Sequence, residues 1–208
     1  MGLLTLEKLV EHWKDFLADP IGMIFSGAGL VWYGGFVGGA LAVLYAIRSN
    51  KLELLPTIDL VAPLTLLGYV FGRGGCFLSG DGDYGPPSDL PWAMAFPKGI
   101  VPTDVPVHPT PLYNMALGLI FFAIMWKLRT KTFPAGTMFG IYLIAAGTER
   151  FITEFWRNTP KIAFGWMSAA QMISLALILG GAFFINWAAS RRTESSVRKV
   201  ASSVEKDR

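Results

Sequence analysis

One long uncharged run near the start of the chain restricts its fold more than any other feature. Residues 21–47 contain no Asp, Glu, Lys or Arg. About 20 apolar residues in a helix are enough to cross the hydrocarbon core of a bilayer. The whole chain is 52% hydrophobic and 16% charged, whereas about 25% of residues are charged in a soluble domain. These observations indicate an integral membrane protein.

Four further segments have the composition of a membrane-spanning helix. Asp59 interrupts one of them, and another ends in the charged sequence TERFITEFW. We therefore predict an all-α fold, a polytopic membrane helix bundle of about five transmembrane helices that forms a single domain over residues 1–190. The predicted spans are residues 21–47, 54–72, 111–128, 134–156 and 164–189.

The two ends of the chain differ from this bundle. Apolar residues recur at helical spacing between charged ones in residues 1–20, which predicts an N-terminal amphipathic helix on the membrane surface. A soluble helix that caps the bundle fits the same pattern. The segment lacks the basic start and apolar core of a cleavable signal peptide. Residues 191–208 are charged and rich in serine, which predicts a disordered basic tail.

The basic residues predict the orientation. Five spans place the N-terminus and the 73–110 loop on one side of the membrane, and most of the lysines and arginines on the other. Because positive loops stay in the cytoplasm, we expect a cytoplasmic C-terminus and an extracytoplasmic, Pro/Gly-rich 73–110 loop. The net charge of +3 is small, and the basic residues gather near segment ends, so no nucleic-acid partner is expected.

Other function classes have little support. A single cysteine allows no internal disulfide, and the two histidines match no metal spacing, so we expect neither a metal nor a cofactor. The chain shows no repeated half, which disfavours a transporter built on inverted repeats.

The first span is rich in glycine. In GLVWYGGFVGG, small residues stand four apart, as in Gly34 and Gly38, and this spacing allows two helix backbones to approach closely in lipid. Tyr33 lies among them, and a phenol in an apolar helix needs a hydrogen-bond partner. That partner is either a neighbouring helix or a ligand.

The sequence GRGGCFLSGDGDYG follows the second predicted span. Arg73 stands at the end of an apolar segment, where a charge is costly unless it is paired, and its planar fork suits a phosphate. The glycines allow the backbone to approach a ligand closely. The alternative is a tight connector in which Arg73 extends to the membrane interface.

A second charged cluster lies in GTERFITEFWRN. Arg150, Glu154 and Arg157 stand at i, i+4 and i+7, so they share one helix face, whereas Glu149 points elsewhere. Glu154 can hold one arginine while the other binds an anion. The alternative is a structural ladder of ion pairs.

The proline-rich stretch between residues 86 and 113 cannot be helical throughout. It is expected to form an ordered lid or arm on the outer face. His108 can accept a proton there, although a histidine before a proline is as often a structural hydrogen-bonding residue.

Taken together, these motifs resemble the prolipoprotein diacylglyceryl transferase family. GLVWYGGFVGG is similar to the family's glycine-rich motif, in which histidine often occupies the place of Tyr33. GRGGCFLSGDGDYG resembles G-R-x-G-N-F-x-N-G-E, HPTPLYN resembles H-P-[ST]-Q-L-Y-E, and GTERFITEFWR matches a helix with the same arginine and glutamate spacing. AAQMIS resembles the family's G-Q-x-x-S more weakly. The resemblance extends from about residue 20 to residue 175.

The resemblance implies a bacterial inner-membrane enzyme. It would transfer the diacylglyceryl group of phosphatidylglycerol to the lipobox cysteine of a prolipoprotein signal peptide and release glycerol 1-phosphate. The implied catalytic residues are Arg73, Arg150, Tyr33, His108 and Glu154. The implied substrate-binding residues are Gly72, Gly75, Cys76, Asp81, Gly85, Tyr113 and Arg157. The resemblance also implies that the reacting thiol comes from the substrate, so the chain's single cysteine, Cys76, is not expected to be the nucleophile. Tyr33, His108, Asp81 and Glu154 all remain candidates for the proton acceptor.

The chain also departs from the family pattern. Cys76 stands where many members have asparagine, Asp81 replaces a glutamate, and Pro111 and Asn114 replace glutamine and glutamate. The family's first membrane segments have no counterpart in the resemblance. The second hypothesis is therefore a non-catalytic paralogue that binds phospholipid or a lipoprotein signal peptide as an accessory membrane protein.

Overall fold

The computed structural model describes residues 30–206 apart from 158, 160, 164 and 165, with side chains over 37–157, 159 and 166–191. The amphipathic helix predicted over residues 1–20 lies outside these residues, as does the side chain of Tyr33. Two compact units divide the chain, Met1–Leu54 and Leu55–Arg208, where the sequence predicts a single domain over residues 1–190. Each unit is described by itself.

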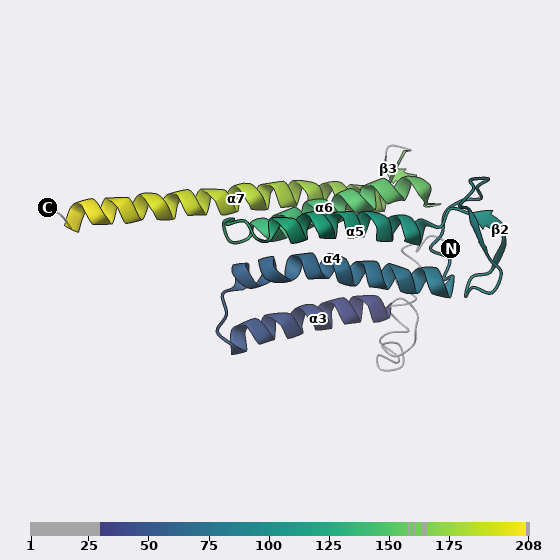
Figure 1. Cartoon of the computed structure of the whole chain (residues 1–208), viewed down its shortest axis with the longest axis horizontal. Helices are drawn as coiled ribbons and strands as arrows, with labels where there is room; N and C mark the ends of the chain where they lie inside the picture. The colour runs from purple at the N-terminus through teal and green to yellow at the C-terminus, as the bar shows by residue number, and fades with distance from the viewer. Residues whose placement is uncertain (1–29, 158, 160, 164–165, 207–208) are drawn as a thin grey trace. The chain divides into compact units, whose positions relative to one another are not determined.

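Helices make up most of the described chain (Figure 1). The first unit contributes α3 (Leu30–Ser49). The second contains four long helices, a 3-10 turn and two short hairpins. These are α4 (Leu54–Ser79), β1 (Met94–Phe96), β2 (Thr103–Val107), α5 (Thr110–Leu128), α6 (Thr137–Thr153), η1 (Glu154–Trp156), β3 (Lys161–Ala163), β4 (Met167–Ser168) and α7 (Ala169–Lys206).

Three of the described helices are long and apolar enough to cross a membrane. They are Leu54–Ser79, Thr110–Leu128 and the Ala169–Arg191 part of α7. Helices α3 and α6 correspond to the other two predicted spans, and the count of five stays a prediction. Helix α7 continues to Lys206, through the segment for which the sequence predicts disorder.

Helix α4 extends beyond the predicted span. The sequence predicts a connector from residue 73, but the helix continues to Ser79 and therefore includes Arg73 and Cys76. The helix ends where Gly80 adopts a φ of 57° and donates its N–H to the carbonyl of Cys76, at 3.1 Å. A glycine in the left-handed region is a common helix terminator. The connector between α4 and α5 is thus residues 80–109.

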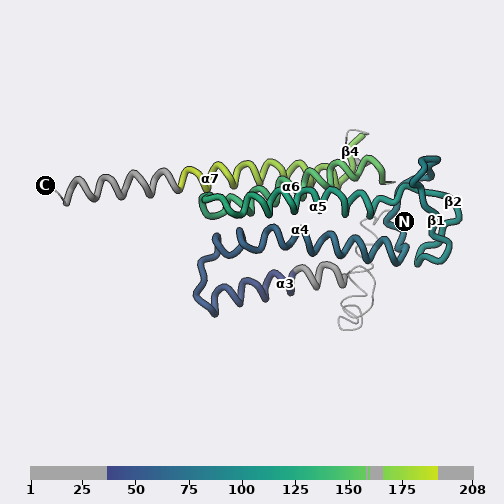
Figure 2. Tube along the Cα trace, viewed as in Figure 1, coloured from purple at the N-terminus to yellow at the C-terminus, as the bar shows by residue number. Residues whose placement is uncertain are grey.

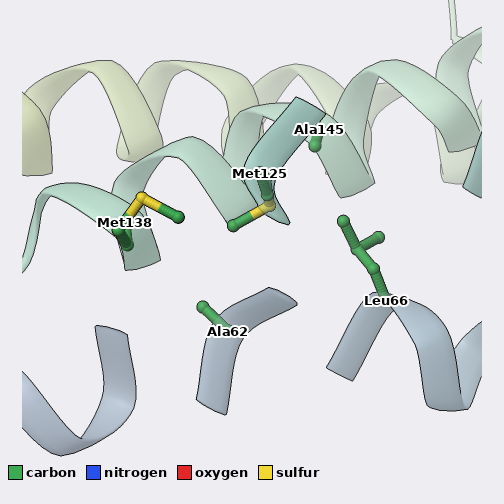
Figure 3. Close-up of a cluster of buried hydrophobic side chains, with 5 residues drawn as sticks. All are labelled: Ala62, Leu66, Met125, Met138 and Ala145. Atoms are coloured by element: carbon green, nitrogen blue, oxygen red, sulfur yellow. The ribbon is translucent and has the colours of Figure 1, made fainter. Parts of the chain in front are cut away.

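Helices α5, α6 and α7 run alongside one another in the second unit (Figure 2). Glycine allows the closest contact, because a Cβ on Gly181 would lie 2.6 Å from the carbonyl oxygen of Gly140. Five buried hydrophobic side chains join α4 to α5 and α6 (Figure 3). They are Ala62, Leu66, Met125, Met138 and Ala145.

The connector between α4 and α5 is an ordered arm with a short antiparallel hairpin. Met94 pairs with Val107 and Phe96 with Thr103, with an irregular register between the two pairs. The ring of Tyr84 stacks on Phe96 with 5.0 Å between centroids. Phe96 also packs edge-on against Phe77 of α4 with 5.8 Å between centroids, and Trp92 donates to Tyr113 of α5, so the arm contacts the end of α4 and the start of α5.

Candidate active site at the ends of α4, α5 and α6

Asp83 joins two arginines from different parts of the chain. Nη1 of Arg73, on α4, contacts Oδ2 of Asp83, and Nη2 of Arg157, after η1, contacts Oδ1. Both contacts are hydrogen-bonded ion pairs. The three side chains are between 17% and 20% exposed, so solvent weakens their attraction less than it does on an open surface. The sequence singled out Asp81, and Asp83 is the aspartate that contacts both arginines.

The turn around Asp83 explains why this aspartate, and not Asp81, contacts the arginines. Oδ1 of Asp81 accepts the backbone N–H of Asp83 at 3.1 Å, which is an Asx turn. Gly82 between them has a φ of 89°, a conformation that side chains disfavour. The hydroxyl of Thr110, at the start of α5, donates to the carbonyl of Asp83. Asp81 therefore shapes the turn, and Asp83 projects to the arginines.

Glu154 links Arg157 to a third arginine, Arg150. Its Oε2 lies 3.0 Å from Nη2 of Arg150 and 3.8 Å from Nε of Arg157, and its Oε1 accepts the hydroxyl of Thr159. Its side chain is fully buried. The i, i+4 pair agrees with the predicted helix face. Because α6 ends at Thr153 and the chain continues as a 3-10 turn, Arg157 also reaches Asp83.

These contacts form one chain, Arg73–Asp83–Arg157–Glu154–Arg150, which we call the arginine network. Three guanidinium groups and two carboxylates leave it with one positive charge. The buried Nη1 atoms of Arg150 and Arg157 have no hydrogen-bond partner among the described residues. Unsatisfied buried donors are costly, so both arginines have capacity to bind an anion.

A second buried network, which sequence reasoning missed, lies beside the first. Glu149 is 3% exposed and accepts hydrogen bonds from Oη of Tyr69, at 3.1 Å, and from Nδ2 of Asn114. Asn114 also donates to the hydroxyl of Thr153 at 3.0 Å. The guanidinium carbon of Arg73 lies 5.1 Å from the centre of the Tyr69 ring. Glu149 thus fixes the tyrosine against which Arg73 rests.

His108 and Tyr113 form a third group. Nδ1 of His108 lies 3.1 Å from Oη of Tyr113, which also accepts the indole N–H of Trp92 at 2.8 Å. The Tyr113 ring packs edge-on against Trp156. Gly85 brings the arm to this point, because a Cβ there would collide with the carbonyl oxygen of Trp156. The structure thereby places His108, Tyr113 and Gly85 near the arginine network.

The remaining predicted residues contribute less contact. A Cβ at Gly72 or Gly75, both on α4, would meet nothing within 4 Å. Cys76 is half-buried with a free thiol. Tyr33 lies on α3, in the other unit. Within the described part of the chain, no three His, Cys, Asp or Glu side chains are grouped to hold a metal ion.

Known proteins match nearly the whole chain. The family model for prolipoprotein diacylglyceryl transferase matches residues 9–187. A phosphatidylglycerol–prolipoprotein diacylglyceryl transferase of Pseudomonas putida is 36% identical over 184 residues, which cover 85% of this chain and 68% of the relative. The protein of that name from Pseudomonas entomophila is 37% identical over 193 residues, 89% of this chain and 71% of the relative. The one from Vibrio vulnificus is 37% identical over 190 residues, 88% and 68% respectively. The chain belongs to the prolipoprotein diacylglyceryl transferase family.

Proposed function

We propose that this protein transfers the diacylglyceryl group of phosphatidylglycerol to the thiol of a prolipoprotein's lipobox cysteine. The substrate sulfur forms a bond to the glyceryl carbon that carries the phosphate. The bond between that carbon and the phosphate oxygen breaks, and its electron pair leaves with glycerol 1-phosphate. The thiol proton passes to a base. The products are a thioether-linked diacylglyceryl lipoprotein and glycerol 1-phosphate.

The Nη1 donors of Arg150 and Arg157 carry this proposal, because neither has a hydrogen-bond partner in the described part of the chain. Glu154 contacts the other nitrogens of both groups, so it orients the arginines without occupying these two atoms. Asp83 orients Arg73 and Arg157 in the same way. A phosphodiester bound at this place receives hydrogen bonds from fixed, partly desolvated guanidinium groups, which are well suited to phosphate.

The same donors favour the reaction as well as binding. A bound phosphodiester carries one negative charge, and the departing phosphate monoester gains a second as the carbon–oxygen bond breaks. Donors that are oriented before the reaction stabilise charge that develops in the transition state. The arginine network is held by Asp83, Glu154 and the Tyr69–Glu149 pair before any substrate arrives.

We assign the proton acceptor to His108. Glu154 is fully buried, ion-paired with Arg150 and hydrogen-bonded to Thr159, and Asp81 is engaged in its Asx turn. His108 is half-buried, and the contact with Tyr113 involves Nδ1, which leaves Nε2 for the substrate. Imidazole is the side chain suited to proton transfer near neutral pH.

The sequence supports an orientation for this chemistry. We place the protein in the bacterial inner membrane, with about five spans in one domain, the arm over residues 80–109 on the extracytoplasmic side and the C-terminus in the cytoplasm. The distribution of lysine and arginine favours this orientation. A phosphatidylglycerol in the outer leaflet then meets the arginine network at the membrane surface.

A direct assay tests the function. The purified protein is supplied with phosphatidylglycerol labelled in its acyl chains and with a lipobox peptide, and the thioether adduct and glycerol 1-phosphate are measured by mass spectrometry. A peptide with serine in place of its cysteine is the matched control and gives no adduct. Folded protein that binds the lipid but forms no adduct would contradict the transferase and support the non-catalytic paralogue.

A further inference from the structure

A pocket lies at the other end of the second unit, between the first half of α4, the end of α5 and the start of α6. Its volume is about 440 Å³, within the range of small-molecule sites. Asp59, on one wall, and Arg73 are separated by about 21 Å along α4, at about 1.5 Å per residue. The pocket therefore cannot share a phosphate with the arginine network.

Most of the pocket wall is apolar and exposed. Leu60 is 73% exposed, Leu64 is 47% exposed, and Trp126 and Phe133 line the same space. Leu60 and Leu64 lie in the first half of α4, and Trp126 lies in the last turn of α5. Both helices are long and apolar enough to span a membrane. Tryptophan is enriched at the ends of such spans, where hydrocarbon meets head groups.

Two exposed cations line the pocket with these apolar side chains. Arg129 and Lys131 lie in the turn between α5 and α6. The guanidinium carbon of Arg129 lies 3.8 Å from the centre of the Trp126 ring. Stacking on a ring engages the face of a guanidinium group and leaves the N–H groups in its plane to bind an anion. The charge of the pocket thus sits beside its apolar wall.

Asp59 is the acidic residue of the pocket, and α6 already occupies its carboxylate. One oxygen accepts the backbone N–H of Gly136 at 2.7 Å, and the other accepts that of Phe139 at 2.8 Å. A carboxylate at the N-terminus of a helix interacts favourably with the partial positive charge there. The negative charge of Asp59 is therefore balanced by the partial positive charge at the start of α6. The two cations, Arg129 and Lys131, remain to attract an anion to the pocket.

We propose that this pocket binds an anionic phospholipid, with its phosphate at Arg129 and Lys131 and an acyl chain along Leu60 and Leu64. Both halves of the pocket are needed for this ligand: a free anion would leave the apolar wall exposed, and a neutral lipid would leave the cations unused. Basic pockets between membrane helices on the cytoplasmic side are typical sites for anionic head groups. The site is independent of the transfer reaction.

Native mass spectrometry of the full chain in detergent tests the proposal. The probe is phosphatidylserine, an anionic lipid that is not the proposed donor, and phosphatidylcholine is the neutral comparison. We expect the double variant Arg129→Gln, Lys131→Gln to bind phosphatidylserine at least about tenfold more weakly than the unaltered protein. The matched control, Arg48→Gln with Lys127→Gln, removes two positive charges that do not line the pocket, and should change binding less than about twofold.

Three results would overturn the proposal. Equal weakening in the control would show diffuse surface attraction. Equal binding of phosphatidylcholine, whose phosphate is balanced by an ammonium group, would show that the pocket does not select a net negative charge. Displacement of the lipid by inorganic phosphate alone would indicate a free-anion site. The variant Leu60→Gln separates the two halves, because it should weaken lipid binding and leave the thermal unfolding temperature nearly unchanged at an exposed position.

Discussion

The two ends of the second unit use carboxylates in different ways. At one end, Asp59 accepts two backbone N–H groups from the start of α6 and thereby connects two helices. At the other end, Asp83 and Glu154 bind arginine side chains, and Nη1 of Arg150 and Nη1 of Arg157 have no hydrogen-bond partner among the residues that the structure describes. Both ends lie on the same helices, and both carry a carboxylate and cations.

The difference separates a structural carboxylate from a positioning one. Asp59 satisfies donors that α6 would otherwise leave unpaired, so its contribution is to stability. Asp83 and Glu154 fix the direction of guanidinium groups that still have donors available, so their contribution is to binding an anion. We therefore expect substitutions at the two ends to separate turnover from stability.

The largest expected effect is the loss of Arg150. Arg150→Gln removes a guanidinium donor that the proposed mechanism directs at the departing phosphate. We expect the rate of adduct formation to fall by about 10²–10³-fold, as when a preorganised donor is removed from other active sites. Single-turnover mass spectrometry measures this rate.

Arg129→Gln is the matched control, since it removes an arginine from the opposite end. It should keep turnover within about twofold of the unaltered protein. Similar losses in both variants would mean that Arg150 contributes only general positive charge, and the comparison between the two ends would fail.

Part of the site could be predicted from the sequence, because its spacing is local. The i, i+4 positions of Arg150 and Glu154 predict their ion pair, and the structure has it at 3.0 Å. The choice between Asp81 and Asp83 depends on a turn with a positive φ at Gly82, which residue types alone do not determine. Helical spacing correctly separates Glu149 from the face of Arg150, but it cannot show that the other face meets α4 and α5.

The fold, like the site, has local features that the sequence predicts and long-range features that it does not. Apolar runs predict helices at α4, α5 and α7. They do not predict the end of α4, since Arg73 and the glycines after it are not apolar and yet remain helical up to Ser79. The Asn114–Glu149 contact joins residues 35 positions apart. It also explains how the chain can have Asn114 where the family pattern has glutamate. The carboxylate of Glu149, on α6, lies beside Asn114 and supplies the negative charge there.

We expect the Asn114–Glu149 contact to support turnover. Glu149→Gln should reduce turnover by about tenfold, since the Tyr69 ring against which Arg73 rests loses its charged acceptor. Asn114→Glu alone should be at least as harmful, because it places two carboxylates side by side.

The double variant Asn114→Glu, Glu149→Gln restores one carboxylate and one amide to the pair, and should recover most of the lost kcat. Recovery of the unfolding temperature without recovery of kcat would contradict this explanation, because the restored pair would then support helix packing without accounting for the lost turnover.

The third prediction concerns the opposite end. Asp59→Ala leaves the N–H groups of Gly136 and Phe139 without their acceptor, which should lower the free energy of unfolding by about 1–2 kcal/mol. Turnover per folded molecule should stay within about twofold. Thermal unfolding in detergent and the adduct assay give the two quantities, and a loss of turnover larger than the loss of folded protein would place Asp59 in the catalytic network.

The smallest expected effect belongs to Cys76, the only cysteine of the chain. Its thiol is half-buried on α4, and its backbone carbonyl, rather than its sulfur, accepts the hydrogen bonds of Ser79 and Gly80. Cys76→Ser keeps that carbonyl and nearly the same volume, so turnover and unfolding temperature should both change little. If the enzyme itself supplied the reacting sulfur, this variant would be inactive and an alkylating reagent would block the unaltered protein. Full activity after alkylation, with the substrate cysteine added afterwards, would show that the reacting sulfur comes from the substrate.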